Sequence, residues 1–289
     1  MSDNSEVVKH IYIKNIQPFA DHPFEVRDDD AMKDTVQSVK AYGVIMPVLV
    51  RPNEEGGYEM ISGHRRMRAC ELAGMDTIPA IVREVDRDTA IIMMVDSNLQ
   101  RENILPSEKA KAYKMKLEAI KRQGQRTDLT SAQLGPKLIE AKNSAATVAQ
   151  DAGESRTQIQ RYIRLNELSP PLQKLVDEEK MGLTPAVEIS YLKPEEQALL
   201  VETIESEQAT PSLSQAKRMR DLSKLGKLND DRMLDIMMEQ KKPLSNNIVL
   251  PADKVNQYFP KSYTNEQKVT TIFRLLDVWQ KRKQQSQNR

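Results

Sequence analysis

The segment Ser62-Gly63-His64-Arg65-Arg66 has the residue types of a phosphate-binding site, and it stands where a predicted strand passes into a predicted helix. A glycine lets an anion approach the backbone, and the first amides of a helix carry partial positive charge. Two adjacent arginines can hold phosphate oxygens in a fork. The sequence therefore predicts an anion site at this junction, while an arginine-rich helix start paired with nearby acids remains the alternative.

A second polar segment, Asn98-Leu99-Gln100-Arg101, closes the next long helix that the sequence predicts. It supplies amide oxygens and one further cation. An asparagine oxygen suits a hard ion such as Mg²⁺ that already holds phosphates and water. We therefore expect this segment to complete the anion site.

The stretch from Ala145 to Ile163 has the spacing of a helix-turn-helix. Ala149 is small enough for two helices to cross closely, and Gly153 can adopt the positive φ of the turn. Ile159 would then fill the core from the second helix. An ordinary pair of antiparallel helices with a polar face is the alternative interpretation.

Ser155, followed three residues later by Gln158, has the pattern of a capping box that opens the second helix. The exposed face of that helix would present side chains that suit base edges and phosphates, because arginine can bond guanine in two places and glutamine can bond adenine. The predicted DNA-contacting residues are Ser155, Arg156, Thr157, Gln160, Arg161 and Arg164.

The elements around these motifs predict an α+β protein. Strand and helix signals alternate through the first hundred residues, and the pattern is almost wholly helical from Pro106 onward. We predict a small mixed α/β domain over 1–105, a helical helix-turn-helix domain over 106–228 and a small C-terminal segment over 229–289. The expected strands are 10–16, 47–51, 58–62, 78–84 and 248–250, and the best-defined helices end at Gly43, Gly74, Asn98, Gly124 and Lys283, with Ser107 as the expected cap of the fourth.

Composition excludes several classes of protein. The chain has 289 residues, one cysteine (Cys70) and a net charge of +1, which argues against a disulfide framework or a cysteine-rich zinc module. His10, His22 and His64 lack the spacing of metal ligands. Because the single cysteine rules out a disulfide framework, we expect an intracellular protein. The longest apolar run, 90–95, is far too short to span a bilayer. The charge is segregated: between Arg101 and Arg126 there are eight basic and three acidic residues, which is the outline of a polyanion binder.

Taken in order, these motifs resemble the ParB family of DNA partition proteins over 11–228. The segment Gly43 to Arg51 is similar to the family's Gly-x-x-x-Pro motif, and Gly63 to Ala69 is similar to its arginine box. Asn98 to Arg101 is similar to the third motif, and the helix-turn-helix follows at the expected distance. The sequence around the motifs is more similar to partition-like proteins of plasmids and integrative elements than to chromosomal members.

The resemblance implies a CTP-dependent DNA clamp in the cytoplasm, on the nucleoid or a plasmid. In such proteins a homodimer recognises a palindromic, centromere-like site, closes around the duplex with CTP and Mg²⁺ bound, and works with a ParA-like ATPase. By motif, Gly43 to Pro47 would lie near the cytosine. Asn98 would approach the metal, and the triphosphate would meet Ser62, Gly63, His64, Arg65, Arg66, Gln100 and Arg101.

Two departures from the family pattern bear on catalysis. His64 and Ser97 stand where the family usually has glutamates associated with metal placement and hydrolysis. We therefore expect at most a weak CTPase. The alternatives are a helix-turn-helix repressor without nucleotide switching and, ranked last, a nucleotide-dependent enzyme with the related sulfiredoxin-like fold. The C-terminal segment is expected either to hold two subunits together as a dimerisation segment or to pack against its own chain as an accessory segment.

Overall fold

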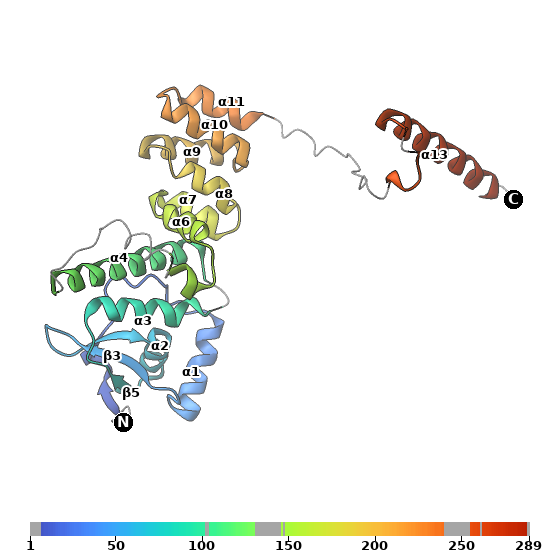
Figure 1. Cartoon of the computed structure of the whole chain (residues 1–289). Helices are drawn as coiled ribbons and strands as arrows, with labels where there is room; N and C mark the ends of the chain where they lie inside the picture. Colours follow the sequence, from blue (N-terminus) through green and yellow to red (C-terminus); the bar gives the residue numbers. More distant parts are fainter. Residues whose placement is uncertain are drawn as a thin grey trace. The chain divides into compact units, whose positions relative to one another are not determined.

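The computed structural model describes residues 7–101, 104–130, 146, 148–239, 255–260 and 262–287. The chain separates into two compact units, Met1–Glu239 and Gln240–Arg289 (Figure 1). The first unit holds a mixed α/β part followed by a helical part, as the sequence predicts. The second unit is described by itself below.

A five-stranded sheet forms the centre of the mixed part, in the order β1-β5-β3-β4-β2. The end of β4 lies beside the start of β3, because the two strands are antiparallel and Leu49 is paired with Ser62. This register brings the Gly43–Pro47 motif and the arginine box to the same end of these two strands. The strands are β1 (Val8–Tyr12), β2 (Ile16–Gln17), β3 (Val48–Pro52), β4 (Tyr58–Ser62) and β5 (Thr77–Val82).

Helices cover both faces of the sheet. Because neighbouring side chains of a strand point to opposite faces, Met60 packs in the core beneath α1 (Asp30–Tyr42) and α2 (His64–Ala73), whereas Ile61 packs beneath α3 (Arg87–Leu99) and α4 (Pro106–Thr130). Cys70 is buried in the first of these cores, as a small apolar residue would be. The β4–α2 junction at Gly63 lies at the end of the sheet where β3 begins.

Two elements, the first strand and the fourth helix, differ from the sequence-based prediction. The strand expected over 10–16 is interrupted by a 3₁₀ turn, η1 (Ile13–Asn15), which separates β1 from β2. The fourth helix begins at Pro106 rather than after a Ser107 cap, since proline fits the first turn of a helix and Glu108 accepts the Leu105 N–H there. It also continues past Gly124 to Thr130.

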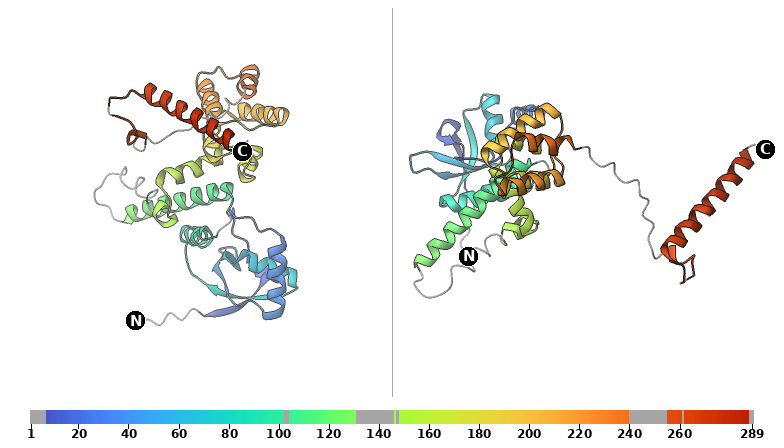
Figure 2. Two further views of the ribbon diagram at one scale, coloured as in Figure 1. Left: turned by 90° about the vertical axis from the view of Figure 1, so that its right-hand side faces the viewer. Right: turned by 90° about the horizontal axis from the view of Figure 1, so that it is seen from above.

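The helical part is a stack of short helices that begins against α4 (Figures 1 and 2). Its core is continuous from Ala110 of α4 to Met237. The last helix packs against α9 and α10, so the compact unit continues beyond the boundary predicted near 228. The 3₁₀ turn η2 (Leu165–Glu167) follows the first of these helices. The helices are α6 (Arg156–Arg164), α7 (Pro170–Asp177), α8 (Leu183–Ile189), α9 (Pro194–Glu207), α10 (Leu213–Lys224) and α11 (Asp230–Met238).

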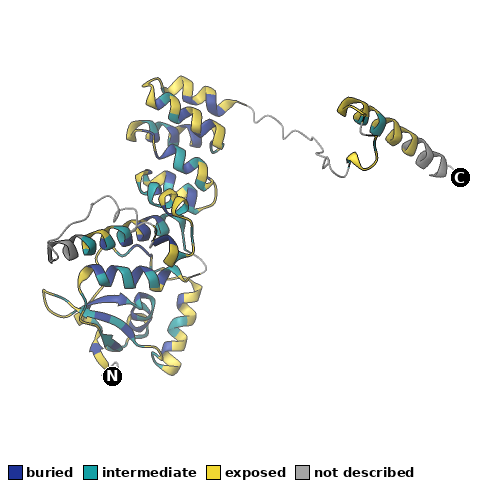
Figure 3. Ribbon diagram, viewed as in Figure 1, coloured by how far each residue is buried: buried dark blue, intermediate teal, exposed yellow. Residues whose placement is uncertain are grey.

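The second unit contains one long helix, α13 (Asn265–Gln287). It coincides with the helix predicted near 266–283, and its apolar side chains, among them Phe273 and Trp279, are exposed (Figure 3). The strand predicted over 248–250 lies outside the described residues. In the part of the chain that the structure describes, no helix combines the length and the apolar character needed to cross a membrane.

Candidate functional site

The arginine box lies at the junction of β4 and α2, and its glycine is required there. Gly63 caps α2 with φ +110, a conformation that side-chain-bearing residues rarely adopt. A Cβ at this position would lie 2.6 Å from Val48 Cγ1 and 3.3 Å from an Arg66 guanidinium nitrogen. The close approach of β3 and α2 therefore depends on the absence of a side chain.

Arg66 joins the arginine box to the Gly43–Pro47 motif. Its Nη1 donates to the Met46 carbonyl at 2.6 Å and to the Pro47 carbonyl at 2.8 Å. Burial, followed by the nearby charge of Arg101, lowers the pKa of Arg66. The structure thus brings the first two sequence motifs into direct contact through one guanidinium.

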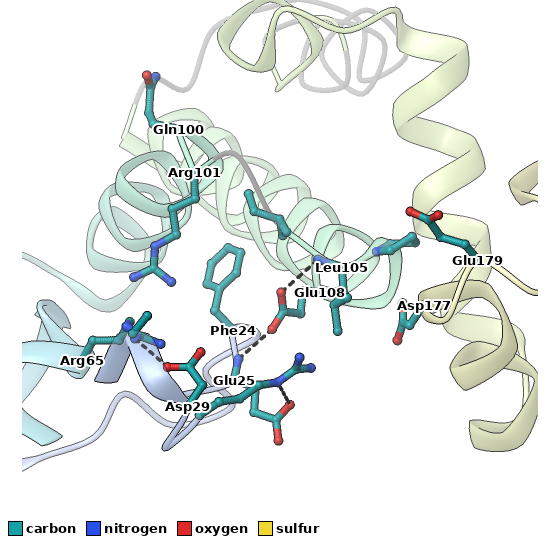
Figure 4. Close-up of a pocket in the computed structure, with 14 residues that line it drawn as sticks. Phe24, Glu25, Asp29, Arg65, Gln100, Arg101, Leu105, Glu108, Asp177 and Glu179 are labelled. Carbon is teal, nitrogen blue, oxygen red and sulfur yellow. Dashed lines mark hydrogen bonds and ion pairs between the residues drawn. The ribbon is translucent and has the colours of Figure 1, made fainter. Parts of the chain in front are cut away.

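A cavity of about 940 Å³ opens beside the arginine box (Figure 4). Arg65, Gln100 and Arg101 line it, so the structure unites the second and third motifs there. The Arg65 guanidinium donates to Asp29 at 3.0 Å. Four further acidic residues line the cavity: Glu25, Glu108, Asp177 and Glu179. Of the other residues predicted to bind nucleotide, Gly43, Pro47, Ser62, Gly63, His64, Arg66 and Asn98 lie outside its lining.

Arg101 is one of three arginines that line the cavity, together with Arg27 and Arg65. Within the described residues its side chain forms no ion pair. Burial lowers the pKa of Arg101, and the charge of Arg65 lowers it further, while Glu108 opposes this shift. Two guanidinium groups that repel one another across a cavity are stabilised by an anion between them. The arrangement is therefore suited to a polyanionic ligand such as a triphosphate.

His64 does not face this cavity but is buried against His22. The two ring centroids are 3.8 Å apart, and His64 Nε2 accepts a long bond of 3.5 Å from the Phe19 N–H. Burial, then the charges of His22 and Arg101, lowers the pKa of His64 to about 3. The imidazole is therefore neutral near pH 7. Sequence reasoning missed His22, because nothing local marks a partner 42 residues away.

This burial predicts a dependence of stability on pH. Because the folded pKa of His64 is about 3 and its ordinary value is 6.5, the unfolded chain takes up a proton that the folded chain refuses. The contribution of the neutral His64 imidazole to the free energy of unfolding is present above pH 6.5 and is lost as the pH falls from 6.5 towards 3. We expect His64→Gln to remove about 2 kcal/mol of the stability difference between pH 7.5 and pH 5.

The measurement is chemical denaturation at both pH values. His10→Gln is the control, because His10 is exposed on β1 and this variant should retain the wild-type pH dependence. Equal pH slopes for His64→Gln and the wild type would contradict the assignment.

Asn98 is buried at the end of α3, and its amide nitrogen is used inside the helix. Nδ2 donates to the Met94 carbonyl at 2.8 Å, and the adjacent Ser97 hydroxyl donates to the same carbonyl at 2.9 Å. The amide oxygen is thus the atom that this residue can offer to a cation. The described residues contain no cluster of three or more histidine, cysteine or acidic side chains placed to hold a metal ion. A cation here would depend on phosphate oxygens for most of its ligands.

The predicted helix-turn-helix has the geometry that the sequence indicates. Residues 148–152 are helical, and Gly153 forms the turn with φ +65. The Gln158 N–H donates to Ser155 Oγ at 3.1 Å, which is one of the two bonds of a capping box. Ile159 is fully buried and packs with Ala149 and with Tyr113 of α4. The turn is thus fixed by the same small and apolar residues that predicted it.

The outer face of α6 carries most of the residues predicted to contact DNA. Ser155 and the side chains of Arg156, Thr157, Gln160 and Arg161 are exposed. Arg164 differs, because its guanidinium donates to the Ser190 hydroxyl at 3.0 Å and to the Ser190 carbonyl at 2.8 Å, and stacks on Tyr191. Arg164 therefore connects α6 to α8 in this structure.

The turn is anchored to α4 by Glu154, which the sequence interpretation did not single out. Glu154 Oε1 accepts from Tyr113 at 3.2 Å and from Lys109 Nζ at 3.4 Å. Burial, then Glu154, raises the pKa of the Tyr113 phenol. Tyr162 packs on the Tyr113 ring, with the two ring centroids 5.8 Å apart.

Comparisons with known proteins match both parts of this arrangement. The ParB N-terminal domain matches residues 1–99, and the ParB HTH domain matches residues 125–219. A probable chromosome-partitioning protein ParB from Neisseria meningitidis is 33% identical over 63% of this chain and 57% of its own length. A nucleoid occlusion protein from Halalkalibacterium halodurans is 34% identical over 69% of this chain and 64% of its own length.

Among solved structures, this chain is similar to a C-terminally truncated chromosome-partitioning protein ParB from Caulobacter crescentus complexed to the centromeric parS site. The identity is 23% and the TM-score 0.43, over 74% of this chain and 98% of that one. The chain spans little more than half the length of the meningococcal relative.

The two matched segments coincide with the mixed and the helical parts of the first unit. The molecule therefore combines a ParB N-terminal domain with a ParB helix-turn-helix domain. The chain belongs to the ParB family.

Proposed function

We propose that this protein is a DNA-binding partition protein that uses CTP as a switch for clamping on DNA. One observation carries the proposal: the cavity lined by Arg65 and Arg101 is also lined by Glu108 of α4, and the same helix packs against the exposed recognition helix α6. A ligand in the cavity and a duplex on α6 would thus act on one shared helix.

The cavity supports a nucleotide as the ligand. The guanidinium groups of Arg65 and Arg101 suit phosphate oxygens. Arg66, from the same helix as Arg65, holds the Met46 and Pro47 carbonyls of the segment that we propose contacts the cytosine. Asn98 would offer its amide oxygen to a Mg²⁺ ion carried by the phosphates. Metal binding would supply charge neutralisation for the triphosphate.

We further propose that CTP is hydrolysed slowly or not at all. His64 and Ser97 occupy the positions where the family resemblance implies glutamates. The His64 ring packs against His22 and lies outside the cavity lining, and its pKa of about 3 makes it a poor base near pH 7, so it does not take the place of a carboxylate in the cavity. The Ser97 hydroxyl is engaged by the helix backbone.

Clamping requires a second copy of the chain, and we propose a homodimer on a palindromic, centromere-like site, on nucleoid or plasmid DNA. The names of the relatives, which are chromosome-partitioning proteins, favour a ParA-like ATPase as the motor partner. The exposed apolar side chains of α13 offer one candidate surface for subunit pairing.

Replacing Arg65 by alanine is expected to abolish CTP uptake while leaving initial DNA recognition intact, because Arg65 lines the cavity and lies outside the helical part. Binding of labelled CTP and ATP is measured with and without DNA. Arg68→Ala is a matched control, since Arg68 comes from the same helix but pairs with Asp28 and Glu71 outside the cavity. CTP-selective uptake supports a partition switch. No uptake by the wild type indicates a repressor, and ATP-driven modification of a substrate indicates an enzyme.

Replacing Gln160 or Arg161 by alanine is expected to do the reverse. Each lost base contact should weaken discrimination between the preferred site and unrelated DNA by about 1–3 kcal/mol, with CTP uptake unchanged. The preferred site is selected from a random duplex library, and binding is measured at several salt concentrations. A uniform loss of affinity for all sequences, with a smaller salt dependence, would instead identify the residue as a phosphate contact.

A further inference from the structure

Arg65 already holds an anion in this structure, and that anion is a side chain of the protein. Asp29 Oδ1 accepts from Arg65 Nη2 at 3.0 Å, and both residues line the cavity (Figure 4). The Asp29 side chain is 48% exposed and that of Arg65 is 28% exposed, so solvent and solutes can reach the contact. The Arg65 hydrogen bond is the main reason that the pKa of Asp29 is low, so the carboxylate is charged near pH 7.

The same carboxylate oxygen has a second role. It accepts the Met32 N–H at 2.8 Å and so caps the start of α1. The segment that follows the end of α1 is held in turn by Arg66, through the Met46 and Pro47 carbonyls. Two neighbouring arginines of α2 therefore contact the N-cap of α1 and the segment that leads from α1 to β3.

A phosphate that binds Arg65 competes with Asp29 for the same guanidinium. Carboxylate and phosphate oxygens use the same N–H donors, and two anions at one guanidinium repel each other. The cap of α1 does not depend on Arg65, because it is formed by the Met32 N–H. Displacement would thus leave α1 folded and release only one of its polar contacts with α2, while the shared apolar core and the Asp28–Arg68 pair remain.

We infer that Asp29 is an internal competitor for the phosphate position at Arg65, and that it sets the affinity of the cavity for polyphosphate anions. The inference rests on the proposed nucleotide site. It assigns to Asp29 two effects: it lowers the affinity for the ligand, and it connects occupancy of the cavity to the position of α1.

Asp29→Asn tests this directly, because asparagine caps a helix about as well as aspartate but carries no charge. The probe is inorganic tripolyphosphate, which needs no base contacts, and its binding to the full chain is measured by calorimetry. We expect the affinity to rise about three- to fivefold, on the scale of an exposed ion pair. Asp28→Asn is the matched control: it breaks the neighbouring pair with Arg68, outside the cavity, and should leave the affinity unchanged.

The outcomes separate this inference from the proposed function. Unchanged or weaker tripolyphosphate binding by Asp29→Asn overturns the competitor role, even if the wild type takes up CTP. Tighter tripolyphosphate binding by Asp29→Asn in a protein that shows no preference for CTP supports the competitor role and contradicts the proposed nucleotide. Equal gains in tripolyphosphate affinity for Asp29→Asn and Asp28→Asn would show that only the overall charge matters, and would overturn the inference. Absence of tripolyphosphate binding in the wild type and in both variants would overturn it as well.

Discussion

Replacing Asp96 and Asp151 together by asparagine is expected to lower the free energy of unfolding of the first unit by about 3–5 kcal/mol. The reason is Lys116, whose side chain is fully buried between them. Its Nζ lies 2.5 Å from Asp96 of α3 and 2.7 Å from Asp151, in the helix that precedes the turn. Neutral amides would leave the buried ammonium without a counter-ion.

The measurement is chemical denaturation, with Asp30→Asn as a control. Asp30 also pairs with a lysine, Lys33, but both side chains are exposed, so the change should stay below about 1 kcal/mol. Adding Lys116→Met to the double variant should restore much of the lost stability, because an uncharged side chain of similar length would fill the same space. A double variant as stable as the wild type would show that the charge of Lys116 is not desolvated.

Replacing Ile159 by alanine is expected to destabilise the helix-turn-helix by about 2–5 kcal/mol, the cost of deleting buried methyl groups and leaving a cavity. Ile159 is fully buried among Tyr113, Val148 and Ala149, so little can move to fill the space. Affinity for DNA should fall together with stability. Thermal unfolding and DNA binding are measured on the same sample.

Ile159→Val separates packing from other effects at this position. It removes one methylene group and should cost about 0.5–1.5 kcal/mol, with DNA affinity close to that of the wild type at a temperature where the variant is folded. A variant Ile159→Ala that unfolds like the wild type would exclude this residue from the core between α4 and α6.

Much of the architecture could be predicted because its signals are local. The positive φ at Gly63 and Gly153 and the cap at Ser155 depend on residues within one helical turn. The positions of the helices that begin after Gly63 and after Ser155 therefore follow from the sequence without any tertiary contact. Met60 and Ile61 are adjacent apolar residues in β4, and such a pair indicates a strand with an apolar core on each face.

The parts that sequence could not give depend on distant partners. Lys116 belongs to a run of basic residues that suggests an exposed polyanion-binding face, but this lysine is buried, because its counter-ions come from segments 20 and 35 residues away. Arg122 of the same run is paired with Asp88. The link between Asp29 and Arg65 spans 36 residues, so no local pattern in the sequence indicates it.

The path of α4 has a consequence for dissecting the molecule. This 25-residue helix follows the boundary predicted near 105, yet its Ala112 and Ala119 pack in the same core as Ile91 and Met94 of α3. A fragment cut at that boundary would present those α3 side chains to water, where exposed apolar surface promotes self-association. The mixed half should accordingly be handled as a soluble piece only when α4 is kept with it, even though the matched ParB N-terminal segment ends at residue 99, before this helix begins.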